Sequence, residues 1–132
     1  MSMQDVTADM LTRIRNSVRN RDKTVICLNN KLNRGIAQVL VDEGYVESFD
    51  VIDDGRAGQL RVNLKYGPRG ERLINSIDRV SKPGCRVYNR VDELPRPLQG
   101  LGITVVSTSF GVMSDRLCRE KKVGGEVVAT VT

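Results

Sequence analysis

Residues 100–118 read GLGITVVSTSFGVMSDRLC, and this stretch decides how the second half of the chain is expected to fold. The apolar run 103–106 lies between glycines and hydroxyl residues, a pattern typical of a buried strand. We expect Ser107, Thr108 and Ser109 to leave this strand as a loop. Short hydroxyl groups donate and accept hydrogen bonds, so at a strand end they can match ribose hydroxyls in the minor groove of an RNA helix. Ser, Thr and Gly after a strand usually mean only a turn, so a plain turn is the alternative.

The sequence on either side of this stretch predicts short elements separated by turns. Arg86, Tyr88 and Arg90 alternate along one of them and would share a face. Because guanidinium groups bind phosphate and an aromatic ring stacks or hydrogen-bonds, this face suits a nucleic acid. The expected elements are a short strand within 73–80, a turn at 82–84, a strand at 85–90, one helical turn at 92–95, another at 115–120, and a final strand at 126–131.

The first half of the chain predicts two amphipathic helices and three strands. Val6, Met10, Leu11, Ile14 and Val18 recur at helical spacing and make one apolar stripe. Two helices on one side of a small sheet would bury such stripes. The expected elements are a helix at 5–20, a strand at 24–28, a helix at about 31–43 that follows a possible Asn29-Asn30 cap, and a hairpin formed by strands 45–52 and 59–66.

Gly67-Pro68-Arg69-Gly70 predicts a boundary between two subdomains. The fold class expected is α+β. Residues 1–68 would form a helix-strand-helix-hairpin subdomain, and residues 69–132 a mostly antiparallel β subdomain with short helices that binds RNA. A chain of 132 residues suits this size.

The net charge of +5 is unevenly distributed along the chain. Residues 31–58 hold three Arg or Lys against six Asp or Glu, whereas residues 82–122 hold eight against four. A one-sided positive field attracts phosphate backbones without reading sequence. Arg13, Asn16 and Arg19 in the first half can reach phosphates, but they equally fit an ordinary solvated helix surface. Lys31 lies in the first turn of the second expected helix, where the helix dipole disfavours a cation, and this placement hints at an external anion.

The sequence predicts neither catalysis nor a cofactor. The chain has no histidine, so the commonest general base and zinc ligand are missing. Its three cysteines are far apart among apolar neighbours, which favours buried, reduced thiols. The nucleophile-elbow, dinucleotide and phosphate-loop motifs are all incomplete. No apolar window is long enough for a membrane span and the N-terminus does not look like a secretory signal, so a cytoplasmic protein is expected.

Several motifs resemble those of the bacterial family of small-subunit ribosomal protein number eight. The resemblance covers nearly the whole chain. It rests on residues 9–16 (DMLTRIRN), 79–84 (RVSKPG), Tyr88, 92–95 (DELP), 100–102 (GLG), 107–109 (STS), 111–113 (GVM), 115–116 (DR) and 124–126 (GGE).

The resemblance implies a two-subdomain α+β protein that binds the central domain of the small-subunit (16S) ribosomal RNA early in ribosome assembly. In this family the C-terminal subdomain holds an irregular RNA helix by its minor groove. The contacts would come from Ser107, Thr108, Ser109, Tyr88 and Glu126, and Arg13, Asn16 and Lys31 would touch neighbouring RNA. Other implied partners are neighbouring small-subunit proteins, number five among them, and the chain's own messenger RNA.

Five further positions in the second half raise expectations of their own. Gly124 and Gly125, like Gly111, would let protein backbone approach the RNA closely, because glycine has no side chain. Glu126 is unsuited to a polyanion, and we expect it either to accept a base amino group or, preferably, to orient the loop hydroxyls. Phe110 stands where the family commonly has a basic residue, so one phosphate contact is lost or a stacking surface gained.

A second hypothesis stays open beside RNA binding. A basic face also fits a protein–protein adaptor that meets acidic partners and has no specific RNA recognition. Binding to an RNA hairpin that falls steeply with salt, and a preference over a scrambled hairpin, would distinguish the two.

Overall fold

The chain folds as two compact units that divide after Asn75. The structure is a computed structural model that describes residues 5–56 and 58–132. It contains helices and antiparallel sheets in both units, which confirms the expected α+β fold with two subdomains.

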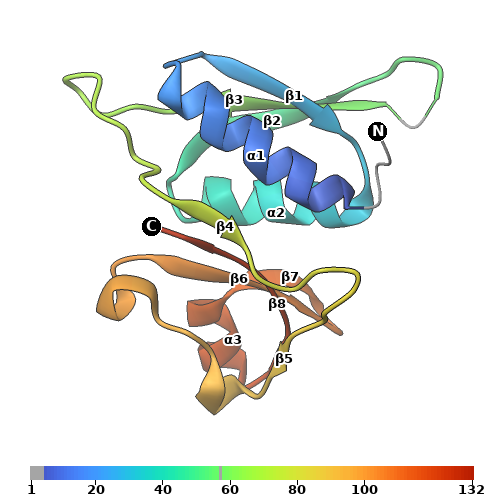
Figure 1. Ribbon diagram of the computed structural model, residues 1–132, viewed down its shortest axis with the longest axis vertical. Helices are drawn as coiled ribbons and strands as arrows, with labels where there is room; N and C mark the ends of the chain where they lie inside the picture. Colours follow the sequence, from blue (N-terminus) through green and yellow to red (C-terminus); the bar gives the residue numbers. More distant parts are fainter. Residues whose placement is uncertain (1–4, 57) are drawn as a thin grey trace. The chain divides into compact units, whose positions relative to one another are not determined.

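The first unit is a three-stranded antiparallel sheet with two helices on one face (Figure 1). The strands lie in the order β1-β3-β2, and α1 packs against β1 while α2 packs against β2 and β3. The arrangement predicted from the two apolar stripes is therefore confirmed. The bounds are α1 Val6–Arg19, β1 Thr24–Leu28, α2 Lys31–Asp42, β2 Val46–Ile52 and β3 Gln59–Leu64.

Both helices of the first unit begin at a side-chain cap. Asp5 accepts a hydrogen bond from the Ala8 amide at 3.0 Å, and Asn30 accepts one from the Asn33 amide at 2.7 Å. Such caps satisfy amide groups that have no partner within the first turn. Gly44 follows α2 with a φ of +82°, a conformation that suits glycine after a helix end.

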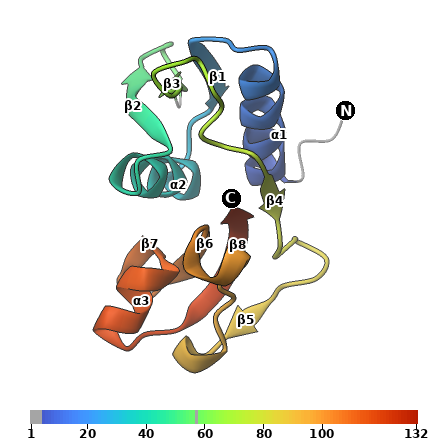
Figure 2. The same cartoon turned by 90° about the vertical axis from the view of Figure 1, so that its left-hand side faces the viewer.

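The second unit is a five-stranded antiparallel sheet with one short helix (Figure 2). β8 is its centre, because β6 pairs along one edge of β8 while β4 and β5 share the other edge. β7 pairs with the far edge of β6. The bounds are β4 Ile77–Arg79, β5 Tyr88–Asn89, β6 Ile103–Thr108, β7 Gly111–Ser114, α3 Asp115–Lys121 and β8 Gly125–Val131, with 3₁₀ turns at Val91–Glu93 and Pro97–Gly100.

A small apolar core holds α3 to this sheet. Val106, Met113, Cys118, Val127 and Leu94 are buried together and come from β6, β7, α3, β8 and the segment after the first 3₁₀ turn. Burial of apolar surface stabilises the folded state by roughly 25 cal/mol per Å². The cluster therefore stabilises the packing of the seven-residue helix α3 on the sheet.

The boundary between the units lies later in the chain than the expected position after residue 68. Residues 69–75 stay with the first unit because hydrogen bonds from side chains and backbone tie them to it. The Arg72 guanidinium donates to the Arg19 carbonyl at 3.1 Å, and the Gly67 amide donates to the Glu71 carbonyl at 2.8 Å. These bonds fold the glycine-rich segment back onto α1 instead of leaving it as a linker.

Two strand expectations need correction. The strand expected at 85–90 is only Tyr88–Asn89, because the chain leaves the edge of β8 at Ser81 and returns at Val87. The segment between loops out and closes on itself through paired backbone bonds between Lys82 and Cys85. In contrast, β6 is longer than expected: Ser107 and Thr108 remain in the strand, since both pair with β7.

The cysteines divide into two buried thiols and one exposed thiol. Cys27 and Cys118 are buried, and burial raises the pKa of each to about 11, so both remain protonated. Cys85 is exposed, contrary to the expectation, because it lies in the 82–86 loop.

In the part of the chain that the structure describes, no helix is both long and apolar enough to cross a membrane.

Candidate nucleic-acid interface

One row of paired residues crosses the sheet of the second unit and brings the expected contact residues together. Tyr88 of β5 pairs with Glu126 of β8, Glu126 pairs with Ser107 of β6, and Ser107 pairs with Val112 of β7. Residues that lie directly opposite in antiparallel strands share a face. Tyr88 is 68% exposed and the others are half-buried, so the row is accessible on that face.

Glu126 lies at the centre of the row and is held by two hydrogen bonds. Its Oε2 atom accepts from the hydroxyl group of Ser81 and from the guanidinium group of Arg86, the latter at 2.9 Å. Burial by itself would raise the pKa of Glu126, but these two bonds and the charges of Arg86 and Arg79 outweigh it and hold the pKa below its ordinary value. The carboxylate is therefore ionised near neutral pH, and it neutralises part of the positive charge around it.

Ser81 connects this surface pair to the interior. Its side chain is fully buried, its hydroxyl group donates to Glu126, and its Oγ atom accepts from the Val87 amide at 3.1 Å. Glu126 thus orients Ser81 and Arg86, and not the loop hydroxyls as expected. Sequence reasoning gave Ser81 no role, although it lies in the RVSKPG motif; only the pairing of distant segments shows its partner.

The three hydroxyl residues have different surroundings. The Thr108 hydroxyl donates to the Gly111 carbonyl at 2.8 Å and accepts from the Phe110 amide at 3.1 Å, so it builds the turn between β6 and β7. Ser109 is exposed at this turn, and Ser107 is half-buried within the row. Ser107 and Ser109 therefore present the hydroxyl groups best placed to meet a ligand.

Gly124 and Gly125 serve the protein's own packing. A Cβ atom at Gly124 would lie 2.5 Å from the Asn89 carbonyl oxygen, and one at Gly125 would lie 2.3 Å from the Ser107 carbonyl oxygen. Real Cβ atoms do not approach so closely, so the missing side chains let β8 lie against its neighbours. The two glycines therefore allow close packing beside the row, and the expected approach of their backbone to RNA stays a prediction.

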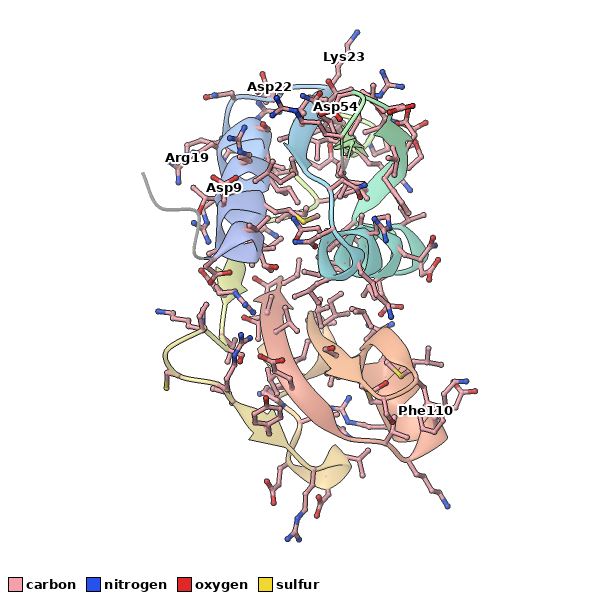
Figure 3. All side chains as sticks on the ribbon, turned by 90° about the vertical axis from the view of Figure 1, so that its right-hand side faces the viewer. Asp9, Arg19, Asp22, Lys23, Asp54 and Phe110 are labelled. Atoms are coloured by element: carbon pink, nitrogen blue, oxygen red, sulfur yellow. The ribbon has the colours of Figure 1, made fainter. Side chains whose placement is uncertain are left out.

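The residues expected to bind RNA in the first unit all lie on its surface. Arg13 and Asn16 are exposed on α1, where Figure 3 shows the neighbouring Asp9 and Arg19 side chains, and Lys31 is exposed at the start of α2. Arg13 is not isolated: its Nε atom lies 2.8 Å from the carboxylate of Asp9, one helical turn earlier. Exposed ion pairs contribute little to stability, so Arg13 can exchange this partner for a phosphate.

The side chains around the row carry mostly positive charge. Arg86 and Arg90 flank Tyr88, and Lys82 is exposed on the loop before them. No group of three or more potential metal ligands occurs among the residues that the structure describes. The arrangement combines cationic groups, hydroxyl groups and an exposed ring, which are the groups that bind RNA through its backbone and ribose hydroxyls.

Comparison with known proteins identifies the family. Residues 5–132 match the family described as Ribosomal protein S8. The small ribosomal subunit protein uS8 of Finegoldia magna is 48% identical over 129 residues, which are 98% of each chain. The protein of the same name from Caldanaerobacter subterraneus subsp. tengcongensis is 50% identical over 131 residues, 99% of each chain. The chain belongs to the ribosomal protein S8 family.

Membership of the S8 family confirms the resemblance found in the motifs. It makes the chain a ribosomal protein of the small subunit, a class of structural proteins not known as enzymes. The row Tyr88–Glu126–Ser107 is consequently a candidate surface for ribosomal RNA.

Proposed function

We propose that this S8-family chain binds the central domain of the small-subunit (16S) ribosomal RNA and aids assembly of the subunit. The second unit would receive the minor groove of an irregular RNA helix on the row Tyr88–Glu126–Ser107, with Ser109 at its end. Arg86 would contact a phosphate, while Glu126 holds that guanidinium in place. Arg13, Asn16 and Lys31 of the first unit would contact neighbouring RNA.

The observation that carries this proposal is the alignment of the row on one accessible face. An RNA helix hides its bases in a deep, narrow major groove, so proteins recognise its shape, its phosphates and its ribose hydroxyls. A surface with hydroxyl groups, a fixed guanidinium and a ring suits these targets. The wide minor groove can accept a sheet face without unwinding of the helix.

Binding to RNA hairpins at several salt concentrations tests the proposal. The affinity for the specific hairpin from the central domain should fall steeply as salt rises. This hairpin should also bind more tightly than a scrambled hairpin of equal length. Equal affinity for both hairpins would reject specific recognition and leave the protein–protein adaptor as the better hypothesis.

Contact with small-subunit protein number five and binding to the chain's own messenger RNA stay predictions. Pull-down with each purified partner can test them.

A further inference from the structure

The chain has five tyrosine and phenylalanine residues, and they differ sharply in exposure. Tyr45, Phe49 and Tyr66 of the first unit are half-buried, whereas Tyr88 is 68% exposed and Phe110 is 73% exposed. An exposed ring gains nothing from the hydrophobic effect in the isolated protein. Both exposed rings belong to the unit that carries the candidate RNA surface, so each is available to contact a ligand there.

The backbone of Phe110 is held in place although its ring is not. Ser109 and Phe110 form a two-residue turn between the paired residues Thr108 and Gly111. The Thr108 hydroxyl accepts from the Phe110 amide at 3.1 Å and donates to the Gly111 carbonyl at 2.8 Å, and Gly111 has a φ of +121°. A ring on a fixed backbone loses little conformational entropy on binding, because it has only two side-chain torsions to restrict.

Tyr88 forms one end of the row, and Phe110 lies in the turn that follows one residue pair beyond Ser107 and Val112 along the strands. Ser107 pairs with Val112, and the next pair, Thr108 with Gly111, closes the turn that carries Phe110. Tyr88 lies two strand positions away from Ser107, about 10 Å at the usual strand spacing. Figure 3 labels the Phe110 side chain on the second unit, where it is 73% exposed. Two exposed rings therefore belong to this region, Tyr88 within the row and Phe110 in the adjoining turn.

The immediate neighbours of Phe110 indicate the class of ligand. Ser109 and Gly111 are both exposed, so the ring has a hydroxyl group on one side of it in the chain and a glycine on the other, with no apolar side chain next to it in the sequence. A protein-docking site needs a contiguous apolar area. A nucleobase instead offers a π-face for the ring and polar edges or a ribose hydroxyl for Ser109, and bases stack on aromatic side chains whatever their sequence.

We propose that Phe110 is a stacking platform for an unpaired nucleobase that projects from the RNA helix held by the row. A fully paired helix keeps its bases stacked inside, so the ligand must be a helix with a bulged or unpaired nucleotide. The inference rests on the proposed RNA-binding function and adds to it the feature of the RNA that the turn recognises. Ser109 would hydrogen-bond the same nucleotide through its ribose or base edge.

The test compares hairpins that differ only in pairing at one nucleotide. In one series, a single unpaired 2-aminopurine is moved along the stem of the specific hairpin; in the matched series, that nucleotide has a pairing partner. The proteins are the full chain, Phe110→Leu, which removes the ring but keeps apolar bulk, and Phe110→Tyr, which keeps a ring. Affinity and the fluorescence of 2-aminopurine, which is quenched on stacking, are measured together.

The full chain and Phe110→Tyr should prefer one unpaired hairpin over its paired counterpart by roughly five- to a hundredfold, the range expected for one stacked base, and should quench its fluorescence. Phe110→Leu should lose the preference and the quenching but keep its affinity for the paired hairpin and its salt dependence. Circular dichroism should show all three proteins equally folded, since the ring packs against no core.

Two results would overturn the inference, and they are distinguishable. If Phe110→Leu keeps the preference and the quenching, or if no position in the series is quenched, Phe110 does not stack on a base, while specific RNA binding still stands. If the full chain binds no hairpin specifically, the proposed function itself fails, and the stacking role fails with it.

Discussion

Ser81 illustrates how a buried hydroxyl group acts on a surface charge. It bridges the Val87 amide and the Glu126 carboxylate, and Glu126 in turn holds the guanidinium of Arg86. A fully buried side chain therefore helps to position, through Glu126, a cation on the candidate RNA surface. Replacing Ser81 should therefore change both the pKa of Glu126 and the free energy of unfolding.

Ser81→Ala should raise the pKa of Glu126 and weaken the fold. The variant loses one bond that favours the carboxylate and leaves the Val87 amide without its acceptor, at a cost of about 1–3 kcal/mol in the free energy of unfolding. Because the folded-state pKa of Glu126 is lowered, its ionised form stabilises the fold above the ordinary pKa, and this contribution is lost as pH falls through the folded-state pKa. In Ser81→Ala that loss should be smaller.

NMR titration of the Glu126 carboxyl carbon and urea unfolding at neutral and acidic pH measure both effects. Ser76→Ala is the matched control, because the Ser76 hydroxyl donates to Asp78 and not to Glu126. An unchanged pKa of Glu126 in Ser81→Ala would show that the other charges alone determine it.

Ser109→Ala should reduce RNA affinity and leave folding unchanged. The Ser109 side chain is exposed at the turn, and an RNA acceptor or donor left without its partner costs about 1–3 kcal/mol. Thr108→Val is the informative contrast, since its hydroxyl group closes the turn and its loss should lower stability as well. Filter binding and thermal unfolding of both variants measure the two effects, and an unaltered affinity of Ser109→Ala would remove this hydroxyl from the interface.

At the scale of elements, the second unit depends on how closely β8 lies to its neighbours. β8 pairs with β4 and β5 on one edge and with β6 on the other, and the pairing with β6 is irregular between Val105 and Val106. α3 is joined to β6 through Asp115, which is almost fully buried, accepts from the Thr104 amide at 3.0 Å and pairs with Arg119. These contacts hold the strands that carry the row to one another and to α3.

Gly125→Ala should separate β8 from β6 and destabilise the second unit. The new methyl group would lie 2.3 Å from the Ser107 carbonyl oxygen, and a backbone atom can move away only if the strands part. We expect a loss of about 1–3 kcal/mol in the free energy of unfolding, typical of overpacking. Gly84→Ala is the control, because a methyl group there meets no atom within 4 Å. Equal urea midpoints for the two variants would contradict the close packing.

At the scale of the whole molecule, the net charge of +5 is less informative than its distribution. Several cations are already paired with carboxylates: Arg13 with Asp9, Arg61 with Asp50, Arg86 with Glu126 and Arg119 with Asp115. These pairs reduce the positive field that remains to attract RNA. The strength of electrostatic binding then depends on which pairs open to exchange a carboxylate for a phosphate.

Arg13→Gln should weaken RNA binding modestly and make it less sensitive to salt. If Arg13 contacts one phosphate, its removal should lower the slope of log affinity against log salt by about 1. Arg13→Lys keeps the charge and should retain the slope, which separates a loss of charge from a change of shape. Titrations at four salt concentrations measure this, and an identical slope in Arg13→Gln would place Arg13 outside the RNA contact.

The sequence by itself determined the local features of this protein. The two amphipathic helices of the first unit and the cap at Asn30 follow from apolar periodicity and capping residues, because these patterns involve residues only a few positions apart. Only the tertiary structure decided that Ser81 holds Glu126, that Gly125 lies against Ser107, and that Cys85 is exposed. Such contacts join segments far apart in the chain, and their strand register arises when the whole sheet pairs and packs, which no local pattern encodes.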